Sequence, residues 1–263
     1  MRHFLYILIL FILFSCSEYQ KVLKSNDINL KFEKAVFYYE KEDFARAMPL
    51  FKELSLIMRG TTKSEEIIYY LAYCHYNSGD YITSSYLFEN YIKTFPNGKH
   101  FEECFYMSAY CIYLESPDYS LDDTFTRKAI KELQDFMDRY PNSMQIDKCS
   151  ALVVELNGKL SLKAFEIAKQ YYDTEHYKAA IIDLNNVLID FPNNVHREEI
   201  QFLILKSSYE LAVNSITEMV SDRLNDALDA FFVFNDNYPN SKHIKEAKKL
   251  SENIKKKLNN KNN

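Results

Sequence analysis

Residues 71–96, LAYCHYNSGDYITSSYLFENYIKTFP, contain the pattern that decides the fold. Apolar residues recur every three or four positions on both sides of Gly79-Asp80, which is the period of an amphipathic α-helix. The Gly-Asp pair interrupts this pattern as a turn, and Asp is a favoured N-cap for the helix that follows. Pro96 ends the second half because proline lacks the N–H that a continuing helix requires. The segment therefore predicts two helices joined by a short turn.

The aromatic-proline ending recurs along the chain. It occurs as Phe95-Pro96, Tyr140-Pro141, Phe191-Pro192 and Tyr238-Pro239, each followed by Asn, with spacings of 45, 51 and 47 residues. A second landmark, Ala72-Tyr73-Cys74-His75-Tyr76, returns 37 residues later as Ala109-Tyr110-Cys111-Ile112-Tyr113. A helix stop that recurs at such distances is typical of arrays of helix pairs.

These residues resemble the tetratricopeptide repeat, which combines a small residue in helix A, a Gly-Asp-Tyr-like turn, Ala and an aromatic in helix B, and a closing proline. The resemblance covers residues 28–241 as five repeats. The third and fifth fit only with insertions between their helices, and the third insertion contains Ser116-Pro117-Asp118. Extra residues between Pro141 and Ala168 predict a lengthened helix. The fold class is therefore an all-α tetratricopeptide-repeat superhelix, in which each pair buries its apolar face against the next.

The end of the chain is predicted to be a capping helix. Ser241 is a suitable N-cap, and the apolar stripe that follows comprises Ile244, Ala247, Leu250, Ile254 and Leu258.

Charge is unevenly distributed along the chain. Residues 242–261 hold eight lysines and two glutamates. Because the whole chain carries −5 and Arg2 contributes +1, residues 17–241 carry −12. An acidic body argues against a nucleic-acid partner, because nucleic-acid binding depends on clustered cations.

The start of the chain has the layout of a secretory signal. Arg2 and His3 precede an apolar run at residues 4–14, and Ser15-Cys16-Ser17 follows. The run is too short to cross a bilayer, which needs roughly 20 apolar residues. Residues 13–16, Leu-Phe-Ser-Cys, resemble a lipobox, and we expect Cys16 to be lipidated and to anchor the mature protein in the membrane. The alternative is an ordinary signal peptide with an incidental cysteine.

The other four cysteines are expected to be small core residues. Cys104 and Cys111 are seven residues apart on one predicted helix, a rise of roughly 10 Å, which is beyond the Cα–Cα reach of a disulfide. Cys74 and Cys149 are the other two. His100 with Cys104 and Cys111 could supply a metal trio, but ligand-type residues at helical spacing usually belong to a core. We find no glycine-rich phosphate loop and no nucleophile-base pattern, and we expect no enzyme activity, cofactor or metal.

An aromatic stripe suggests a binding surface. In helix A of such repeats, positions i, i+4 and i+7 share one helix face, and the resemblance implies that this face lines a concave groove. The candidate groove residues are Phe32, Tyr39, Tyr69, Tyr73, Tyr76, Tyr106, Tyr110 and Tyr113. Tyrosine suits a wet peptide-binding groove because its apolar ring carries a polar hydroxyl. The alternative is that these rings pack between helices.

Together, the lipobox and five repeats resemble the BamD family, tetratricopeptide lipoproteins of the outer-membrane β-barrel assembly machinery. The local signature is residues 16–24, CSEYQKVLK, followed by the aromatic-Pro-Asn repeat ends. The resemblance implies a lipid anchor in the outer membrane, a periplasmic body, an Omp85-type barrel subunit bound by the C-terminal repeats and unfolded outer-membrane protein substrates bound by the N-terminal repeats. Two alternatives remain. One is a different periplasmic lipoprotein scaffold, acting in cell-envelope division or secretion, and the other is a peptidoglycan-acting or sugar-binding protein, for which the sequence shows no paired acidic residues.

The expected organisation has five parts. These are a signal peptide at residues 1–15, a lipidated tether at 16–27, repeats one to three at 28–141, repeats four and five at 142–241, and the basic capping helix and tail at 242–263.

Overall fold

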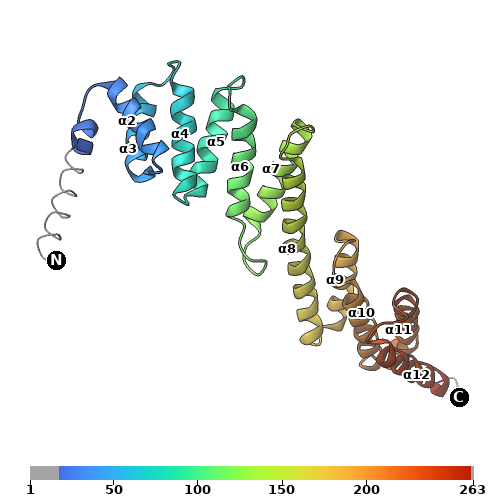
Figure 1. The fold of residues 1–263 in the computed structure, drawn as a ribbon. Helices are drawn as coiled ribbons and strands as arrows, with labels where there is room; N and C mark the ends of the chain where they lie inside the picture. The colour runs from blue at the N-terminus through green and yellow to red at the C-terminus, as the bar shows by residue number, and fades with distance from the viewer. Residues whose placement is uncertain (1–17, 262–263) are drawn as a thin grey trace, which may run out of the picture. The chain divides into compact units, whose positions relative to one another are not determined.

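The computed structural model describes residues 18–261, so the predicted lipidation site Cys16 and the apolar run before it lie outside the described residues. Between residues 18 and 261 the secondary structure is helical, without a strand, which confirms the all-α prediction (Figure 1). After a helical segment at residues 18–23, the helices are α2 (Ile28–Glu40), α3 (Phe44–Ile57), α4 (Ser64–Asn77), α5 (Tyr81–Thr94), α6 (Phe101–Leu114), α7 (Thr124–Arg139), α8 (Ile146–Asp173), α9 (Tyr177–Asp190), α10 (Arg197–Val213), α11 (Thr217–Asn237) and α12 (Ile244–Lys261). No helix in this part of the chain is long and apolar enough to span a membrane.

The turn inside a repeat follows from local chemistry. The side chain of Asp80 accepts a hydrogen bond from the Thr83 backbone N–H at 3.1 Å and so caps α5. Gly79, immediately before it, has a φ of 78°, a left-handed conformation that costs glycine little. Asp43 caps α3 in the same way, and Glu42 before it has a φ of 57°. One turn geometry is therefore used in both repeats, although only the second has glycine there.

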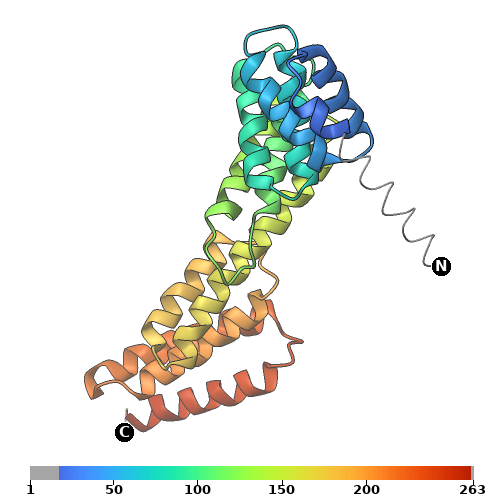
Figure 2. The same cartoon turned by 90° about the vertical axis from the view of Figure 1, so that its left-hand side faces the viewer.

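The chain divides into two compact units, with the division inside the long helix α8. Unit 1 comprises the described residues up to Pro117 together with Asp122–Leu156, and unit 2 comprises Asp118–Leu121 and the described residues from Asn157 onward. In unit 1, helices α2 to α7 pack against one another in chain order (Figures 1 and 2). In unit 2, α9, α10, α11 and α12 do the same, and α12 also contacts α10.

The core of unit 1 consists of small residues at helix crossings and large apolar side chains around them. Ala35, Ala47 and Ala72 are fully buried, as a close helix approach requires, and Phe51 and Phe88 fill the space beside them. All four described cysteines are buried free thiols, which confirms that they are core residues: Cys74, Cys104, Cys111 and Cys149.

Helix α12 closes the core of unit 2. Ala247 and Ile254 are fully buried there against residues of α10 and α11. The other members of the predicted stripe, Ile244, Leu250 and Leu258, are partly buried and pack against the same cluster. The capping helix is thereby confirmed.

The predicted cap of this helix is Ser241. Its hydroxyl accepts a hydrogen bond from the His243 N–H at 2.9 Å. The expected N-cap is wrong, because α12 begins at Ile244 and the Ser241 hydroxyl bonds within the turn before the helix.

The extra residues of three repeats are accommodated in different ways. Helix α8 has 28 residues, so the predicted lengthened helix is present. The third insertion is the loop at residues 115–123 between α6 and α7, as expected. The fifth repeat differs from the prediction. Only residues 214–216 separate α10 from α11, and these helices have 17 and 21 residues. The additional residues therefore extend the helices, because backbone hydrogen bonds are satisfied more readily in a helix than in a long loop.

Candidate functional site

Repeats two to five end in the same backbone turn. The residue three positions after the aromatic donates its N–H to the aromatic residue's carbonyl, and the four distances are 2.9 Å for Gly98 to Phe95, 3.0 Å for Ser143 to Tyr140, 3.0 Å for Asn194 to Phe191, and 3.1 Å for Ser241 to Tyr238. Ser143, Asn194 and Ser241 also accept a hydrogen bond from the N–H two residues later through their side chains. The aromatic-Pro-Asn motif is thus a tight connection that sets where the next helix A begins.

The residue just before helix A covers an aromatic ring of the preceding helix A. The contacts are Lys63 Nζ over the Phe32 ring at 4.7 Å, and His100 on Tyr69, His196 on Phe165 and His243 on Phe202 with ring centroids 4.0, 4.6 and 4.4 Å apart. All three histidine contacts are stacked, and the lysine contact is a cation–π interaction. One side-chain position therefore joins neighbouring repeats in both units.

In unit 1 the aromatic stripe forms a connected cluster of rings, which we call the tyrosine cluster: Tyr69, Tyr73 and Tyr76 of α4, and Tyr106, Tyr110 and Tyr113 of α6. Tyr76 lies 6.5 Å from Tyr110 between centroids and links the two helices. On α6, Tyr106, Tyr110 and Tyr113 are stacked with interplanar angles of about 15° and centroids 5.6 and 5.7 Å apart. The spacing i, i+4, i+7 therefore produces a ladder of nearly parallel rings.

Glu103 fixes one end of the tyrosine cluster. Its Oε1 accepts hydrogen bonds from the hydroxyls of Tyr69, at 3.0 Å, and Tyr73. Its Oε2 lies 3.2 Å from Nδ1 of His100. Burial, together with the nearby carboxylate charge, raises the pKa of both tyrosines well above the ordinary value. Both phenols therefore stay protonated as donors, and the rings are held in place across the joint between α4 and α6.

Two residues of α8 border the other end. The Tyr113 hydroxyl donates to Glu155 Oε2 at 2.9 Å, and burial raises the pKa of Tyr113 to about 12. Lys148 is exposed, and its Nζ lies 4.3 Å from the centroid of Tyr110 and 5.3 Å from that of Tyr106. The ladder on α6 is therefore bordered by one cation and one carboxylate.

The eight predicted groove residues are not equivalent. Tyr106 is buried at 6% exposure and packs edge-on against the core residue Phe136, so it belongs to the core. Tyr39 contacts Tyr70, which in turn contacts Tyr69, and this joins α2 to the cluster. Phe32 has no ring contact with the other seven among the described residues. The seven residues other than Tyr106 are half-buried.

Sequence reasoning missed the polar residues that hold the rings. Glu103, Lys148, Glu155 and Tyr70 were not among the predicted site residues, and His100 was considered only as a metal ligand. In the structure His100 stacks on Tyr69, whereas Cys104 and Cys111 are buried. Within residues 18–261, no three His, Cys, Asp or Glu side chains come close enough to hold a metal ion. For His100 the available signal was a histidine at the same place before three helices, at His100, His196 and His243.

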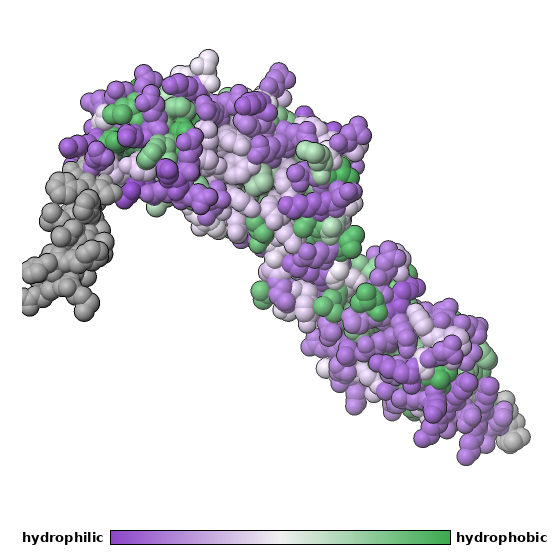
Figure 3. Space-filling model, in the orientation of Figure 1, coloured by the Kyte–Doolittle hydropathy of each residue, from purple (hydrophilic) through white to green (hydrophobic). Residues whose placement is uncertain are grey.

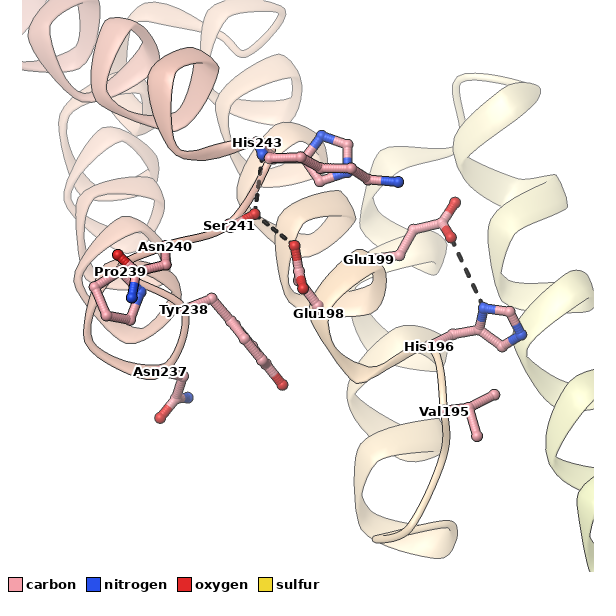
Figure 4. A pocket seen from close by; sticks show the side chains of 11 residues that line it. Val195, His196, Glu198, Glu199, Asn237, Tyr238, Pro239, Asn240, Ser241 and His243 are labelled. Atoms are coloured by element: carbon pink, nitrogen blue, oxygen red, sulfur yellow. Dashed lines mark hydrogen bonds and ion pairs between the residues drawn. The ribbon is translucent and has the colours of Figure 1, made fainter.

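Unit 2 contains a cleft of about 660 Å³ beside its last repeat ending (Figure 4). His196, Glu198 and Glu199 line one side, and the turn at residues 237–243 lines the other. Ser241 Oγ donates to Glu198 Oε1 at 2.6 Å. Ser241 bonds to Glu198, and His196 lies 3.9 Å from Glu199, so polar groups of the cleft pair with one another where the turn before α12 meets the start of α10.

Comparison with known proteins identifies the family to which this helical-repeat chain belongs. The YfiO family, described as outer membrane lipoproteins, matches the chain over residues 25–224, which includes the tyrosine cluster and most of unit 2. The chain belongs to this family. Membership of the YfiO family associates the protein with the outer membrane, and it confirms the family resemblance. The N-terminal motif at residues 16–24 lies outside the matched residues.

Two named relatives agree with the family assignment. The chain is 26% identical over 178 residues to a protein of Aquifex aeolicus (strain VF5) named "Putative outer membrane protein assembly factor BamD", an alignment covering 67% of this chain and 58% of the relative. It is 21% identical over 193 residues to the outer membrane protein assembly factor BamD of Caulobacter vibrioides, covering 73% of this chain and 63% of the relative. The matches thus span about three fifths of the length of these relatives.

Proposed function

We propose that this YfiO-family lipoprotein is an outer-membrane protein assembly factor that binds unfolded substrate segments on the tyrosine cluster of unit 1 and an Omp85-type barrel subunit through unit 2. In this proposal lipidated Cys16 anchors the protein to the outer membrane and the helical body lies in the periplasm. The names of the two relatives support the role in assembly. The contacts of the tyrosine cluster support peptide binding there.

The single observation that carries the peptide proposal is Lys148 above the tyrosine ladder. An extended peptide that ends in an aromatic residue presents a ring and a carboxylate next to each other. Tyr110 and Tyr113 offer half-buried ring faces for the side chain, and the exposed ammonium of Lys148 offers a partner for the carboxylate. Rigid rings lose little conformational entropy on binding, which favours them as contact residues.

The first test separates the ring contribution from folding. Tyr110→Ala is expected to weaken binding of an aromatic-ended peptide by about 1–2 kcal/mol, the size of a moderate hot spot. Tyr106→Phe is the matched control, because its hydroxyl is buried without a hydrogen-bond partner among the described residues and its removal leaves the packing intact. Affinity and melting temperature are measured together. If affinity holds in Tyr110→Ala while stability collapses, the rings serve the core and the peptide proposal is wrong.

The second test concerns the carboxylate. Lys148→Gln is expected to weaken binding of a peptide with a free C-terminus but not of the same peptide as a C-terminal amide. If Lys148 acts only through the rings, Lys148→Gln weakens the binding of both peptides equally, and this result would contradict the assigned role.

The proposed partner of unit 2 is tested by a pull-down from detergent-solubilised membranes. It should recover an Omp85-type barrel as the main partner, and the absence of such a barrel would reject that part of the proposal.

A further inference from the structure

Helix α12 carries a strongly basic face that the packing of unit 2 does not use. Its apolar stripe is buried against α10 and α11, so the opposite face points to solvent. From residue 242 to residue 257 the helix and its preceding residues hold seven exposed lysines against Glu246 and Glu252. Figure 3 shows hydrophilic residues gathered over this end of the chain.

Five of these lysines lie on one side of the helix and define what we call the lysine face: Lys245, Lys248, Lys249, Lys255 and Lys256. At about 100° per residue they fall within about a third of the helix circumference. Their Cα atoms extend over roughly 17 Å along the axis. Glu252 lies among them, so the face carries four net positive charges spread over this side of the helix.

The lysine face is not neutralised within the described part of unit 2. None of its five ammonium groups forms an ion pair with a described carboxylate. Glu246, the other acid of α12, lies 3.5 Å from the ammonium of Lys206 on α10. Lys255 contacts the ring of Phe232 at 6.0 Å, a cation–π contact that leaves its charge unpaired. Like charges held close together on a fixed helix repel one another, and an anionic surface relieves this repulsion.

We propose that the lysine face binds the anionic phospholipid headgroups of a membrane surface. The family of outer membrane lipoproteins keeps the chain beside such a surface. Clusters of four to eight basic residues on an amphipathic helix are typical of attraction to anionic lipids. Lysine is depleted from protein–protein interfaces, where arginine provides the hot spots, and α12 has no arginine. A spread of separate point charges along one helix face matches an array of phosphates better than a shaped protein pocket.

The mode of binding follows from the burial of the apolar stripe. Because Ala247 and Ile254 are already fully buried in unit 2, α12 has no free apolar face to insert into the acyl region. Contact is therefore electrostatic and lies at the headgroups. It must weaken sharply with salt, since the screening length falls from about 10 Å at 0.1 M to about 3 Å at 1 M. This proposal concerns α12 alone and does not depend on the peptide groove.

The experiment uses the chain from residue 16 onward with Cys16→Ser, so that no acyl group contributes. Co-sedimentation is measured with vesicles of equal parts phosphatidylglycerol and phosphatidylcholine, and with phosphatidylcholine alone. The unsubstituted chain is expected to bind the first vesicles at low salt and not the second. Replacing Lys248, Lys249, Lys255 and Lys256 by Gln is expected to weaken binding at least 100-fold, at roughly fivefold per lysine. Lysine and glutamine have similar helix propensity, so the melting temperature should stay unchanged.

The matched control replaces four exposed lysines of unit 1 by Gln: Lys21, Lys24, Lys41 and Lys52. It changes the net charge by the same amount and should retain binding to within a few-fold. Equal loss in both variants would mean that net charge, not the lysine face, governs binding, and would overturn the proposal. Binding to polyglutamate without binding to anionic vesicles would assign the face to an acidic protein and would also overturn it.

Discussion

The imidazole of His100 lies over the phenol ring of Tyr69, with 4.0 Å between ring centroids and 26° between the ring planes. His100 precedes α6 and Tyr69 lies in α4, so the contact joins two successive repeats. His196 makes the equivalent contact with Phe165 in unit 2, at 4.6 Å and 10°. Since both units contain a stack between a histidine just before a helix and an aromatic ring of the preceding helix A, the two units can serve as controls for each other.

We predict that His100→Ala lowers the free energy of unfolding by about 1 kcal/mol, the size of one aromatic pair. It should also weaken peptide binding, because Tyr69 and Glu103 lose their common neighbour. His196→Ala removes the same type of stack and should destabilise the protein similarly without changing peptide affinity. Urea unfolding and peptide titration of both variants check this. Equal effects on affinity would show that the histidine of unit 1 has no special relation to the peptide groove.

The close approach of Gly98 and Tyr91 in the turn after α5 can be tested by a double-mutant cycle. Tyr91 Oη accepts the His100 N–H at 3.0 Å and donates to Glu65, and a Cβ built on Gly98 would lie 2.6 Å from that oxygen. We predict that Gly98→Ala costs about 1–3 kcal/mol in the wild-type background because of this overlap. The cost should be smaller in a Tyr91→Phe background, where the oxygen is absent. Additive effects of the two substitutions, measured by thermal and urea unfolding, would show that the overlap is relieved elsewhere.

Alkaline pH should destabilise unit 1 through its buried phenols. Burial raises the pKa of Tyr39 to about 12, and the pKa of Tyr113 is raised to about 12 as well. The unfolded chain releases these protons near pH 10. The contribution to stability is therefore complete below about pH 10 and is lost as the pH rises toward 12. Urea unfolding across this range should show the decline, and Tyr39→Phe should reduce its slope. A slope unchanged by this substitution would contradict the assignment to Tyr39.

The core cysteines should resist thiol reagents in the native protein. Burial raises the pKa of Cys111 to about 11 and that of Cys74 to about 12, and the thiolate is the reactive form. We predict that a chromogenic disulfide reagent reacts with all four core thiols at least 100-fold faster in denaturant than in buffer. The experiment uses the chain with Cys16→Ser, so that the reagent reports only the four core thiols. Fast reaction in buffer would show that helices of unit 1 open readily.

Cys16 can be tested in cells, although it lies outside the described residues. Cys16→Ala is expected to abolish incorporation of labelled palmitate and to leave a folded protein without its lipid anchor. Membrane fractionation and labelling measure the two outcomes. Labelled palmitate still entering the Cys16→Ala chain would disprove the lipobox interpretation.

The sequence by itself determined the repeat architecture. A helix ends at each of the four aromatic-proline pairs, whereas Pro49 lies inside α3. The proline endings together with the apolar periodicity therefore specified the helix pairs and the buried stripe of α12. They also fixed which tyrosines share a face, because residues four apart on a helix lie side by side whatever surrounds them.

Only the tertiary structure decided what those faces contact. Tyr106 and Tyr110 have the same local pattern, yet Tyr106 is buried against Phe136 and Tyr110 stays half-buried. The hydroxyls of Tyr69 and Tyr73 meet Glu103, which is 30 or more positions away in the chain. The fifth repeat takes its extra residues into helices rather than a loop. These outcomes depend on the packing of one repeat against the next, and the angle at which two helices meet is set by all side chains at the contact together, so no local pattern specifies it.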